Sequence, residues 1–288
     1  MQDLDLACKL AIRKTLSYRT TFHYPMSFYQ LSTFLISERT IQPTTLTQHL
    51  DILDKRRKIV KTNNLYKIPG VPYISREKRT NLSKESINSF KKMGKLLEKI
   101  PWIKLLAITG SVAAFNPHEE DDLDILVVAQ KNRLWLTRFF VFAYLKMLKL
   151  CRTDKDPNGK ICPNIFISEE ELSWDKKKHN LYVAHEIAMI HPIINRDNMY
   201  FRFMEANDWI YKYFGNFTTH FPTNGEKYHT TPKLADVLER IIMLLQLAYM
   251  RNKKTTETTT KTLIHFNKKD NTVGILKRYN KLNLKTKF

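Results

Sequence analysis

Two apolar segments separated by a short polar connection constrain the fold of this chain more than any other feature. The first covers residues 103–108, and the second covers residues 125–129, directly after Asp122-Leu123-Asp124. Alternate side chains of a strand point to the same face. The pattern therefore predicts two strands, with the carboxylates of Asp122 and Asp124 side by side at the start of the second and the apolar residues beside them turned into the core.

Paired carboxylates of this kind predict a metal site. Asp122 and Asp124 repel each other and are costly unless a cation lies between them. Mg²⁺ takes one or two carboxylates and completes its octahedron with water and substrate phosphates. Gly110 lets a ligand approach the backbone, and Ser111 offers a hydroxyl and an amide N–H at the expected start of a helix, where phosphate is favoured. The segment therefore predicts a site for a nucleoside triphosphate with Mg²⁺ or Mn²⁺.

Gly110, Ser111, Asp122 and Asp124 form the pattern GS-x10-DxD, which resembles the signature of the polymerase-beta-like nucleotidyltransferases. The spacing is that of the minimal nucleotidyltransferases, some of which are antitoxins that adenylylate a partner protein. The resemblance implies a small mixed sheet and a reaction in which a hydroxyl attacks the α-phosphate of a nucleoside triphosphate and pyrophosphate leaves. The alternative is a surface loop with a chance acidic cluster at the start of a strand.

The family places a third carboxylate on the next strand, which we expect over residues 161–167. This sequence has Asn164 there, so Asn164 is the third candidate catalytic residue beside Asp122 and Asp124. An asparagine coordinates through its carbonyl, but it carries no charge and cannot act as a base near neutral pH. The glutamates at 169–171 are another source of a carboxylate, although such a run is more often a solvated helix start.

Further candidates for ligand contacts lie on predicted helices. Arg133 and Arg138 are about one and a half turns apart on the helix expected over residues 132–150. They can reach the nucleotide phosphates, although arginines after a strand more often pair with local acids. After residue 179 the chain is expected to form helices, whose polar and aromatic residues either line the acceptor side of the site or pack in a helical core. These residues are Tyr182, His185, Glu186, Phe203, Glu205, Asn207 and Trp209.

Residues 1–80 predict three helices and a hairpin, with the tight turn at Asn63-Asn64. Three helices and a wing resemble a winged helix-turn-helix, with residues 45–58 in the recognition position. A DNA reader needs basic and amide side chains there to meet phosphates and base edges. The candidates are Gln48, His49, Lys55, Arg56, Arg57, Lys58 and Lys61. The alternative is a winged helix that serves only protein contact or packing on the catalytic domain.

The charge balance bears on the partners of the chain. Lysine and arginine number 48 against 28 acidic residues, a formal charge of +20. This excess predicts attraction to nucleic acid, nucleotides or other polyanions, and a lysine-rich source proteome explains it equally well. Residues 134–150 are too short and too charged to span a bilayer, no signal peptide opens the chain, and the three cysteines are scattered. We therefore expect a cytoplasmic protein with no membrane partner.

Together these segments predict an α+β protein in three parts. They are a winged helix-turn-helix-like domain (1–80), a nucleotidyltransferase core with a small mixed sheet (81–175), and a C-terminal helical region with a basic tail (176–288). The segment 69–82 is the expected linker, and 276–288 the expected solvated tail. The implied function is nucleotidyl transfer to a protein, a nucleic acid or a small molecule. The alternative is a non-catalytic regulator that senses a nucleotide and binds DNA.

Overall fold

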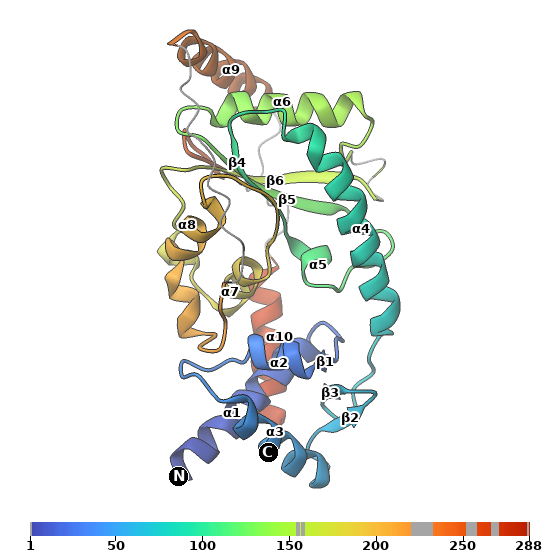
Figure 1. Cartoon of the computed structure of the whole chain (residues 1–288). Coiled ribbons are helices and arrows are strands. Elements are labelled where there is room, and N and C mark those ends of the chain that lie inside the picture. Colours follow the sequence, from blue (N-terminus) through green and yellow to red (C-terminus); the bar gives the residue numbers. More distant parts are fainter. Residues whose placement is uncertain are drawn as a thin grey trace.

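The computed structural model is an α+β protein with two sheets, one in the upper half of Figure 1 and one in the lower half. It describes residues 2–153, 156, 159–219, 233–251, 258–265, 271–286 and 288. The α+β class predicted from the sequence is therefore confirmed. Within these residues, no helix combines the length and the apolar character that crossing a membrane requires.

Helices and strands are interspersed along the chain. The helices are α1 (Gln2–Thr20), α2 (Phe28–Thr33), α3 (Pro43–Lys55), α4 (Arg76–Leu97), α5 (Gly110–Ala113), α6 (Leu134–Met147), α7 (Leu181–Ala188), α8 (Met199–Glu205), α9 (Lys233–Arg251) and α10 (Thr272–Lys285). The strands are β1 (Met26–Ser27), β2 (Val60–Thr62), β3 (Leu65–Lys67), β4 (Ile103–Ile108), β5 (Leu123–Ala129), β6 (Ile161–Ser168), β7 (His191–Asn195), β8 (Thr258–Thr259) and β9 (Leu263–His265).

A six-stranded mixed sheet in the order β7-β4-β5-β6-β9-β8 carries the paired aspartates. β4 and β5 are antiparallel, and Gly110 to Ala113 form the single turn of helix α5 after β4. β5 and β6 are parallel, and α6 provides the long crossover that a parallel pair needs. The strand expected over residues 161–167 is thus present and lies directly beside the strand that carries Asp124.

Both faces of this sheet are covered by helices, which explains the apolar runs in the sequence. Leu106 and Val127 belong to a core shared with α4, α6 and α9, whereas Leu105 and Leu126 belong to a core shared with α7, α8 and α10. Neighbouring residues of a strand therefore enter opposite cores. A strand buried on both faces reads as a nearly continuous apolar segment, and every position of β4 is buried.

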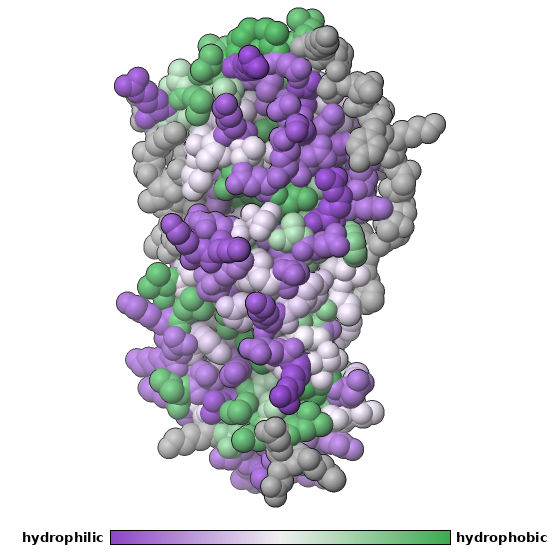
Figure 2. All heavy atoms as spheres, turned by 90° about the vertical axis from the view of Figure 1, so that its left-hand side faces the viewer, coloured by the Kyte–Doolittle hydropathy of each residue, from purple (hydrophilic) through white to green (hydrophobic). Residues whose placement is uncertain are grey.

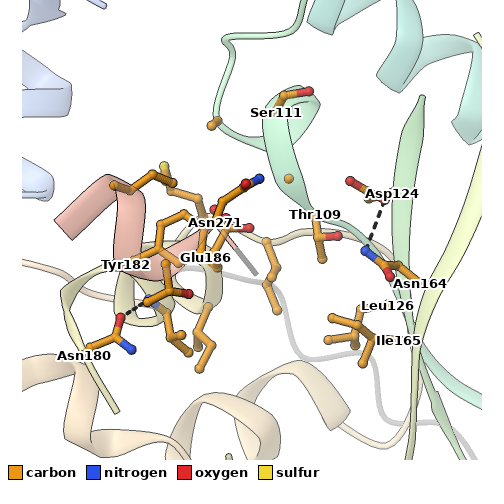
Figure 3. Close-up of a pocket in the computed structure, with 18 of the residues that line it drawn as sticks. Thr109, Ser111, Asp124, Leu126, Asn164, Ile165, Asn180, Tyr182, Glu186 and Asn271 are labelled. Carbon is orange, nitrogen blue, oxygen red and sulfur yellow. Dashed lines mark hydrogen bonds between the residues drawn. The ribbon is translucent and has the colours of Figure 1, made fainter. Parts of the chain in front are cut away.

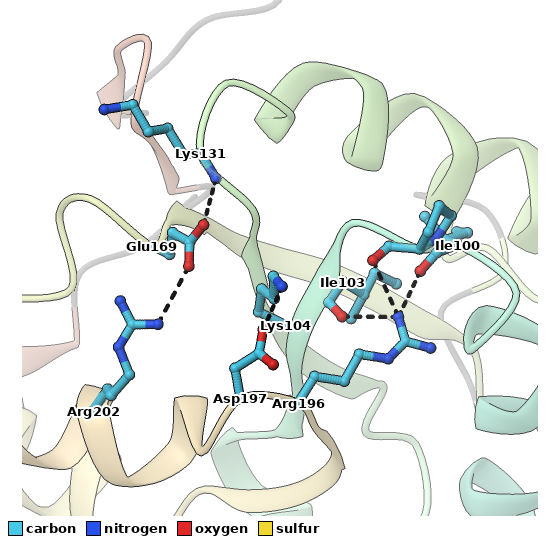
Figure 4. A network of polar contacts seen from close by, with 9 residues as sticks. Ile100, Ile103, Lys104, Lys131, Glu169, Arg196, Asp197 and Arg202 are labelled. Atoms are coloured by element: carbon cyan, nitrogen blue, oxygen red, sulfur yellow. Dashed lines mark hydrogen bonds and ion pairs between the residues drawn. The ribbon is translucent and has the colours of Figure 1, made fainter. Parts of the chain in front are cut away.

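Lys104 interrupts the apolar sequence of β4 and forms a buried ion pair with Asp197, which follows β7 (Figure 4). Their side chains are only 3% and 7% exposed. Next to Asp197, Arg196 donates from Nη1 to the carbonyl oxygens of Ile100 at 3.0 Å and Ile103 at 3.1 Å. These contacts attach the segment between β7 and α8 to the start of β4.

The N-terminal helices α1 and α3 enclose a small core with the antiparallel sheet β1-β3-β2. Leu46, Leu50 and Leu53 form the buried apolar stripe of α3, which begins at Pro43. Asn63 and Asn64 both have positive φ, at 49° and 58°, and connect β2 to β3. The predicted tight turn is therefore present, because two asparagines tolerate this backbone conformation well.

Three segments differ from the sequence prediction. The second half of the expected linker, 69–82, is helical, because α4 begins at Arg76 and buries Arg79. The region after residue 179 contributes strands β7, β8 and β9 to the large sheet as well as helices. The expected tail is largely helix α10, which buries Tyr279 with its ring 5.7 Å from that of Tyr18 on α1. Of the threonine run at residues 255–262, which the sequence suggests is a loop or a helix end, residues 255–257 lie outside the described residues.

Helix α9 lies against α6 and exposes apolar side chains on its other side. Figure 2 shows hydrophobic residues gathered at the top of the molecule, where Figure 1 places α9, while most of that view is hydrophilic. The exposed large apolar residues of α9 are Leu234, Val237, Leu238, Ile241, Leu244, Leu245 and Tyr249. Their spacing of three and four places them along one stripe of the helix. Contacts among the described residues leave this stripe open.

Candidate functional site

A cavity of about 700 Å³ lies between the large sheet and helices α1, α7 and α10. Figure 3 shows Asp124 and Asn164 on the sheet side, Ser111 on α5, and Tyr182, Glu186 and Asn271 facing them across the space. Cavities of roughly 300–1,000 Å³ are typical of small-molecule sites. The paired aspartates thus open into a space large enough for a nucleotide.

Asp122 and Asp124 reach this cavity from the start of β5, while Leu123 and Ile125 are buried, as the alternation predicts. Carboxylate oxygens of the two aspartates and the sulfur of Cys162 lie within 4.8 Å of one another. Among the residues that the structure describes, this is the one group of three such side chains close enough to hold an ion. Cys162 is a member of the group that the sequence pattern did not indicate.

The two carboxylates are electrostatically unequal. The pKa of Asp124 is raised to about 7, first by burial and then by the charge of Asp122, against the opposing effects of Arg152 and of a hydrogen bond from Cys162. Arg152 Nη1 lies 3.0 Å from Asp122 Oδ2. Asp122 therefore has a cationic neighbour from the chain, whereas Asp124 keeps its proton up to neutral pH. A further cation would favour the charged form of Asp124.

Gly110 is required for this geometry. Its φ is +65°, and a Cβ at this position would lie 2.7 Å from Asp124 Oδ2. The backbone N–H of Thr109 donates to the carbonyl oxygen of Asp124 at 2.9 Å, which keeps β5 close to α5. Ser111 lines the cavity, as expected. Because α5 is a single turn, the helix dipole adds little there, and the hydroxyl and backbone amides are what α5 offers to phosphate.

Asn164 lies beside Asp124, where its Nδ2 donates to Asp124 Oδ1 at 3.2 Å (Figure 3). In the β5–β6 register Cys162 pairs with Asp124, and the register shifts between Ile125 and Leu126, which leaves Asn164 as the extra residue of a bulge. The face beside the aspartates therefore presents Cys162 and Asn164. Burial and the charge of Asp124 raise the pKa of Cys162 to about 12, so its sulfur remains a thiol.

These donors fit Mg²⁺ or Mn²⁺ better than a thiol-seeking metal. Asp122 and Asp124 offer carboxylate oxygens, and the amide of Asn164 offers a carbonyl oxygen after a rotation that exchanges its oxygen and nitrogen. Cys162 contributes the one sulfur beside these oxygens, and hard cations such as Mg²⁺ and Mn²⁺ prefer oxygen ligands. Water and phosphate oxygens would have to complete the coordination, as is usual for Mg²⁺.

Other residues expected at the site lie elsewhere. Arg133 donates from Nη1 to Asp236 on α9 at 2.6 Å, and Arg138 donates to Gln246 on the same helix. Both arginines are buried between α6 and α9, and neither lines the cavity. The glutamates at 169–171 are also outside it. Glu169, for example, accepts from the Lys131 backbone N–H at 2.9 Å (Figure 4).

The far wall of the cavity is formed by residues distant in the sequence. Tyr182, Glu186 and Phe203 line it, as one of the two interpretations of that region predicts. His185, Asn207 and Trp209 are buried in packing positions, as the alternative predicts: His185 stacks on Tyr18 with ring centroids 4.2 Å apart, for example. Glu205 is exposed and lies outside the cavity. Arg19, Lys177, Lys178 and Asn271 also line the cavity and have no local signal in the sequence. They meet there only because α1 and α10 pack beside the sheet.

Glu186 is the acidic residue of this far wall. Burial, followed by the negative charge of Asp124, raises its pKa to about 7, and Arg19 opposes this effect. The cavity thus contains two carboxyl groups that change charge near neutral pH, one on the sheet side and one on α7.

The candidate DNA-binding residues lie on α3, at its end and on β2. Gln48, Lys55, Arg56, Arg57 and Lys61 are all exposed. His49, named with them from the sequence, is instead buried, and its Nε2 contacts the Asp5 carboxylate. The exposed residues therefore remain available to a polyanion, whereas His49 attaches α3 to α1.

No family model, curated protein or solved structure matches this chain. The geometry and chemistry of the site are therefore what indicates a function.

Proposed function

We propose that this protein is a nucleotidyltransferase that uses Mg²⁺ or Mn²⁺ to transfer a nucleoside monophosphate from a nucleoside triphosphate to a hydroxyl acceptor. The convergence of Asp122 and Asp124 on a cavity, directly against a glycine whose missing Cβ gives Asp124 its room, is the observation that supports this proposal best. Arg152 pairs with Asp122 alone, so Asp124, which burial and repulsion disfavour in its charged form, gains from a further cation.

Each part of the site has a role in this reaction. Asp122 and Asp124 would hold the metal, with Asn164 as a neutral neighbour that orients Asp124 through its hydrogen bond. Ser111 and the backbone near Gly110 would contact the phosphates of the nucleotide. When bound, the metal supplies charge neutralisation at the attacking and leaving oxygens, and the protein supplies alignment. The acceptor has to enter from the wall formed by α1, α7 and α10.

The position of the radioactive label in a nucleotide tests this proposal. We expect purified protein, Mg²⁺ or Mn²⁺ and a heat-inactivated lysate to yield a labelled product from an α-³²P nucleoside triphosphate but not from the γ-³²P form, because pyrophosphate leaves. Asp124→Asn is the matched negative control. Label transferred from the γ-position would instead identify a kinase and contradict nucleotidyl transfer.

The second candidate function is a non-catalytic regulator that senses a nucleotide and binds DNA, without transferring the nucleotide to an acceptor. Two observations favour it: Asn164 is uncharged where a third carboxylate is expected, and the N-terminal helices with the sheet β1-β3-β2 support a winged-helix assignment. Its exposed basic residues would meet phosphates. Metal-dependent nucleotide binding without label transfer from either nucleotide would favour this function.

The DNA-binding hypothesis predicts a salt-dependent affinity of the full chain for duplex DNA. Each phosphate contact releases counterions, so about four to six contacts give a log–log slope of roughly −4 to −5. Arg56→Gln with Arg57→Gln should make the slope shallower by about 1–2. Lys91→Gln with Lys92→Gln removes the same charge from exposed positions of α4 and should leave it unchanged. Fluorescence anisotropy over a salt series measures these slopes, and a wild-type slope near zero would reduce the N-terminal region to a packing module.

A further inference from the structure

Arg19, near the end of α1, is a buried cation that borders the cavity. The residue is only 5% exposed. Its guanidinium lies 4.4 Å from the centre of the Tyr24 ring, and Nη1 lies 3.8 Å from the sulfur of Met189 at the end of α7. These are soft neighbours that neutralise no charge. Arg19 therefore brings a positive charge from the N-terminal region to the wall of this cavity, and it also lines a second, smaller cavity beside it.

No acidic group among the described residues forms an ion pair with Arg19, and its Nε has no hydrogen-bond partner. Glu186 affects the electrostatics of Arg19 without approaching within ion-pair distance. Burial lowers the pKa of Arg19, yet guanidinium groups keep their charge in proteins. An uncompensated buried charge is costly, so this arrangement needs an anion that the described chain does not supply.

The surroundings of Arg19 favour an anion as well. The start of α10, with Asn271, Thr272 and Val273, lines the same cavity. Asn271 precedes a 14-residue helix and does not cap it with its side chain. The N-terminal end of a helix of this length favours phosphate. Lys177 and Lys178 add two further cations to the cavity lining.

We propose that Arg19 binds a phosphate group of a ligand, on the wall of the cavity that α1, α7 and α10 form. The site is distinct from the paired aspartates, of which Figure 3 shows Asp124 on the sheet side. The planar guanidinium of Arg19 suits two oxygens of one phosphate. This phosphate belongs either to a phosphorylated acceptor or to the end of the triphosphate. That choice rests on the proposed function, whereas the phosphate site itself does not.

Calorimetry of the full chain with inorganic phosphate tests the site, in chelator and at constant ionic strength. We expect saturable binding to the wild type and binding at least about tenfold weaker to Arg19→Gln, because a charge-assisted hydrogen bond is lost. Arg76→Gln is the matched control, because Arg76 lies 5.7 Å from the same Tyr24 ring but does not line the cavity. The charge of Arg76 acts on Arg19 only from outside the cavity, so its loss should weaken phosphate binding by about twofold at most, much less than the loss of Arg19.

Two results would overturn the proposal: no saturable phosphate binding by the wild type, or equal binding by Arg19→Gln. Thermal melts check folding, and Arg19→Lys is the substitute if Arg19→Gln does not fold. Arg19→Lys keeps the charge but loses the planar fork, so its affinity should fall between those of the wild type and Arg19→Gln.

A second titration, into protein saturated with Mg²⁺–ATP, identifies the source of the phosphate. Unchanged phosphate binding assigns the site to a phosphorylated acceptor, and competition assigns it to the triphosphate. Mg²⁺–ATP binding that depends on Asp124, with no phosphate binding in chelator, would remove the Arg19 site and leave the proposed function standing. Phosphate binding that depends on Arg19, with no binding of Mg²⁺–ATP, would support the Arg19 site and reject the proposed function.

Discussion

Asp124→Asn is expected to abolish metal-dependent binding of a nucleoside triphosphate, with an affinity in Mg²⁺ at least about 100-fold lower than that of the wild type. Asp124 lies within 4.8 Å of its metal-binding partners and accepts the hydrogen bond that orients Asn164. An amide at position 124 keeps the shape but removes the negative charge that attracts the cation. Polyphosphate is then repelled by Asp122 with no cation between them.

The same variant lowers nucleotide affinity but should raise the stability of the metal-free protein above neutral pH. The folded pKa of Asp124 is about 7, above the unfolded value of about 3.9, so the folded state binds the proton more tightly. The contribution of Asp124 to stability in chelator is therefore fully present below about pH 4 and is lost as the pH rises to about 7. At pH 8 Asp124 is ionised, and burial and the charge of Asp122 make that form destabilise the folded state. An asparagine cannot ionise, so Asp124→Asn should melt at a higher temperature than the wild type at pH 8 in chelator.

Calorimetry with Mg²⁺–ATP, and thermal melts in chelator from pH 5 to pH 8, measure the two effects. Glu120→Gln is the matched control, because it removes one negative charge from an exposed residue four positions away that does not line the cavity. It should leave both results close to those of the wild type. Equal Mg²⁺–ATP affinity for the wild type and Asp124→Asn would reject the metal site.

The sequence predicts the part of the structure that its local patterns determine. The apolar runs at 103–108 and 125–129 are β4 and most of β5, because a strand buried on both faces has almost no polar positions. Gly110 lies next to Asp124 because the chain turns back after the single turn of α5 and enters β5 beside β4. Continuous apolar runs of this length, bounded by polar residues, can be recognised in the sequence, so the centre of the sheet was predictable.

Elements that depend on distant partners were not predictable. β7 and β9 have five and three residues, and their pairing with β4 and β6 is decided by tertiary contacts. The basic sequence of α10 has few apolar positions, and only its packing against α1 reveals that Ile275 and Tyr279 are core residues. Arg19 is at the cavity for the same reason, since nothing around it in the sequence marks a ligand contact.

The arginines of α6 show the limit of spacing arguments. Arg133 and Arg138 follow the metal-binding strand at a distance from which a helix can reach phosphate. The helix instead turns both side chains toward α9, where Asp236 and Gln246 accept their hydrogen bonds. Sequence spacing gives the distance along a helix but not which face meets the ligand. The interpretation in which such arginines make contacts within the protein is the one that the geometry favours.

Asn164→Asp is expected to raise the affinity for Mg²⁺ or Mn²⁺ by about tenfold, because affinity for these cations grows with the number of charged ligands. Asn164 Nδ2 is already 3.2 Å from Asp124 Oδ1, so a carboxylate at this position meets the pair directly. In chelator the variant loses that hydrogen bond and gains a repulsion, so its melting temperature should fall. Saturating metal should restore it.

Asn164→Ala separates the two contributions. It removes the same hydrogen bond to Asp124 without adding a charge, so it should also melt earlier in chelator but gain no metal affinity. Titrations with Mn²⁺ and melts with and without metal compare the two variants. Equal metal affinity for Asn164→Asp and Asn164→Ala would show that position 164 does not face the ion, against the placement of β6 beside β5.

The labelling assay with Asn164→Asp then distinguishes the two candidate functions. Phosphoryl chemistry depends mainly on alignment and charge neutralisation, so a site with two carboxylates can transfer a nucleotide slowly. If transfer occurs in the wild type, the added carboxylate should increase the rate together with metal affinity. Tighter metal binding with no labelled product would instead favour the regulator, because the metal pair would then serve recognition of the nucleotide and the neutral Asn164 would suit a protein that binds without turnover.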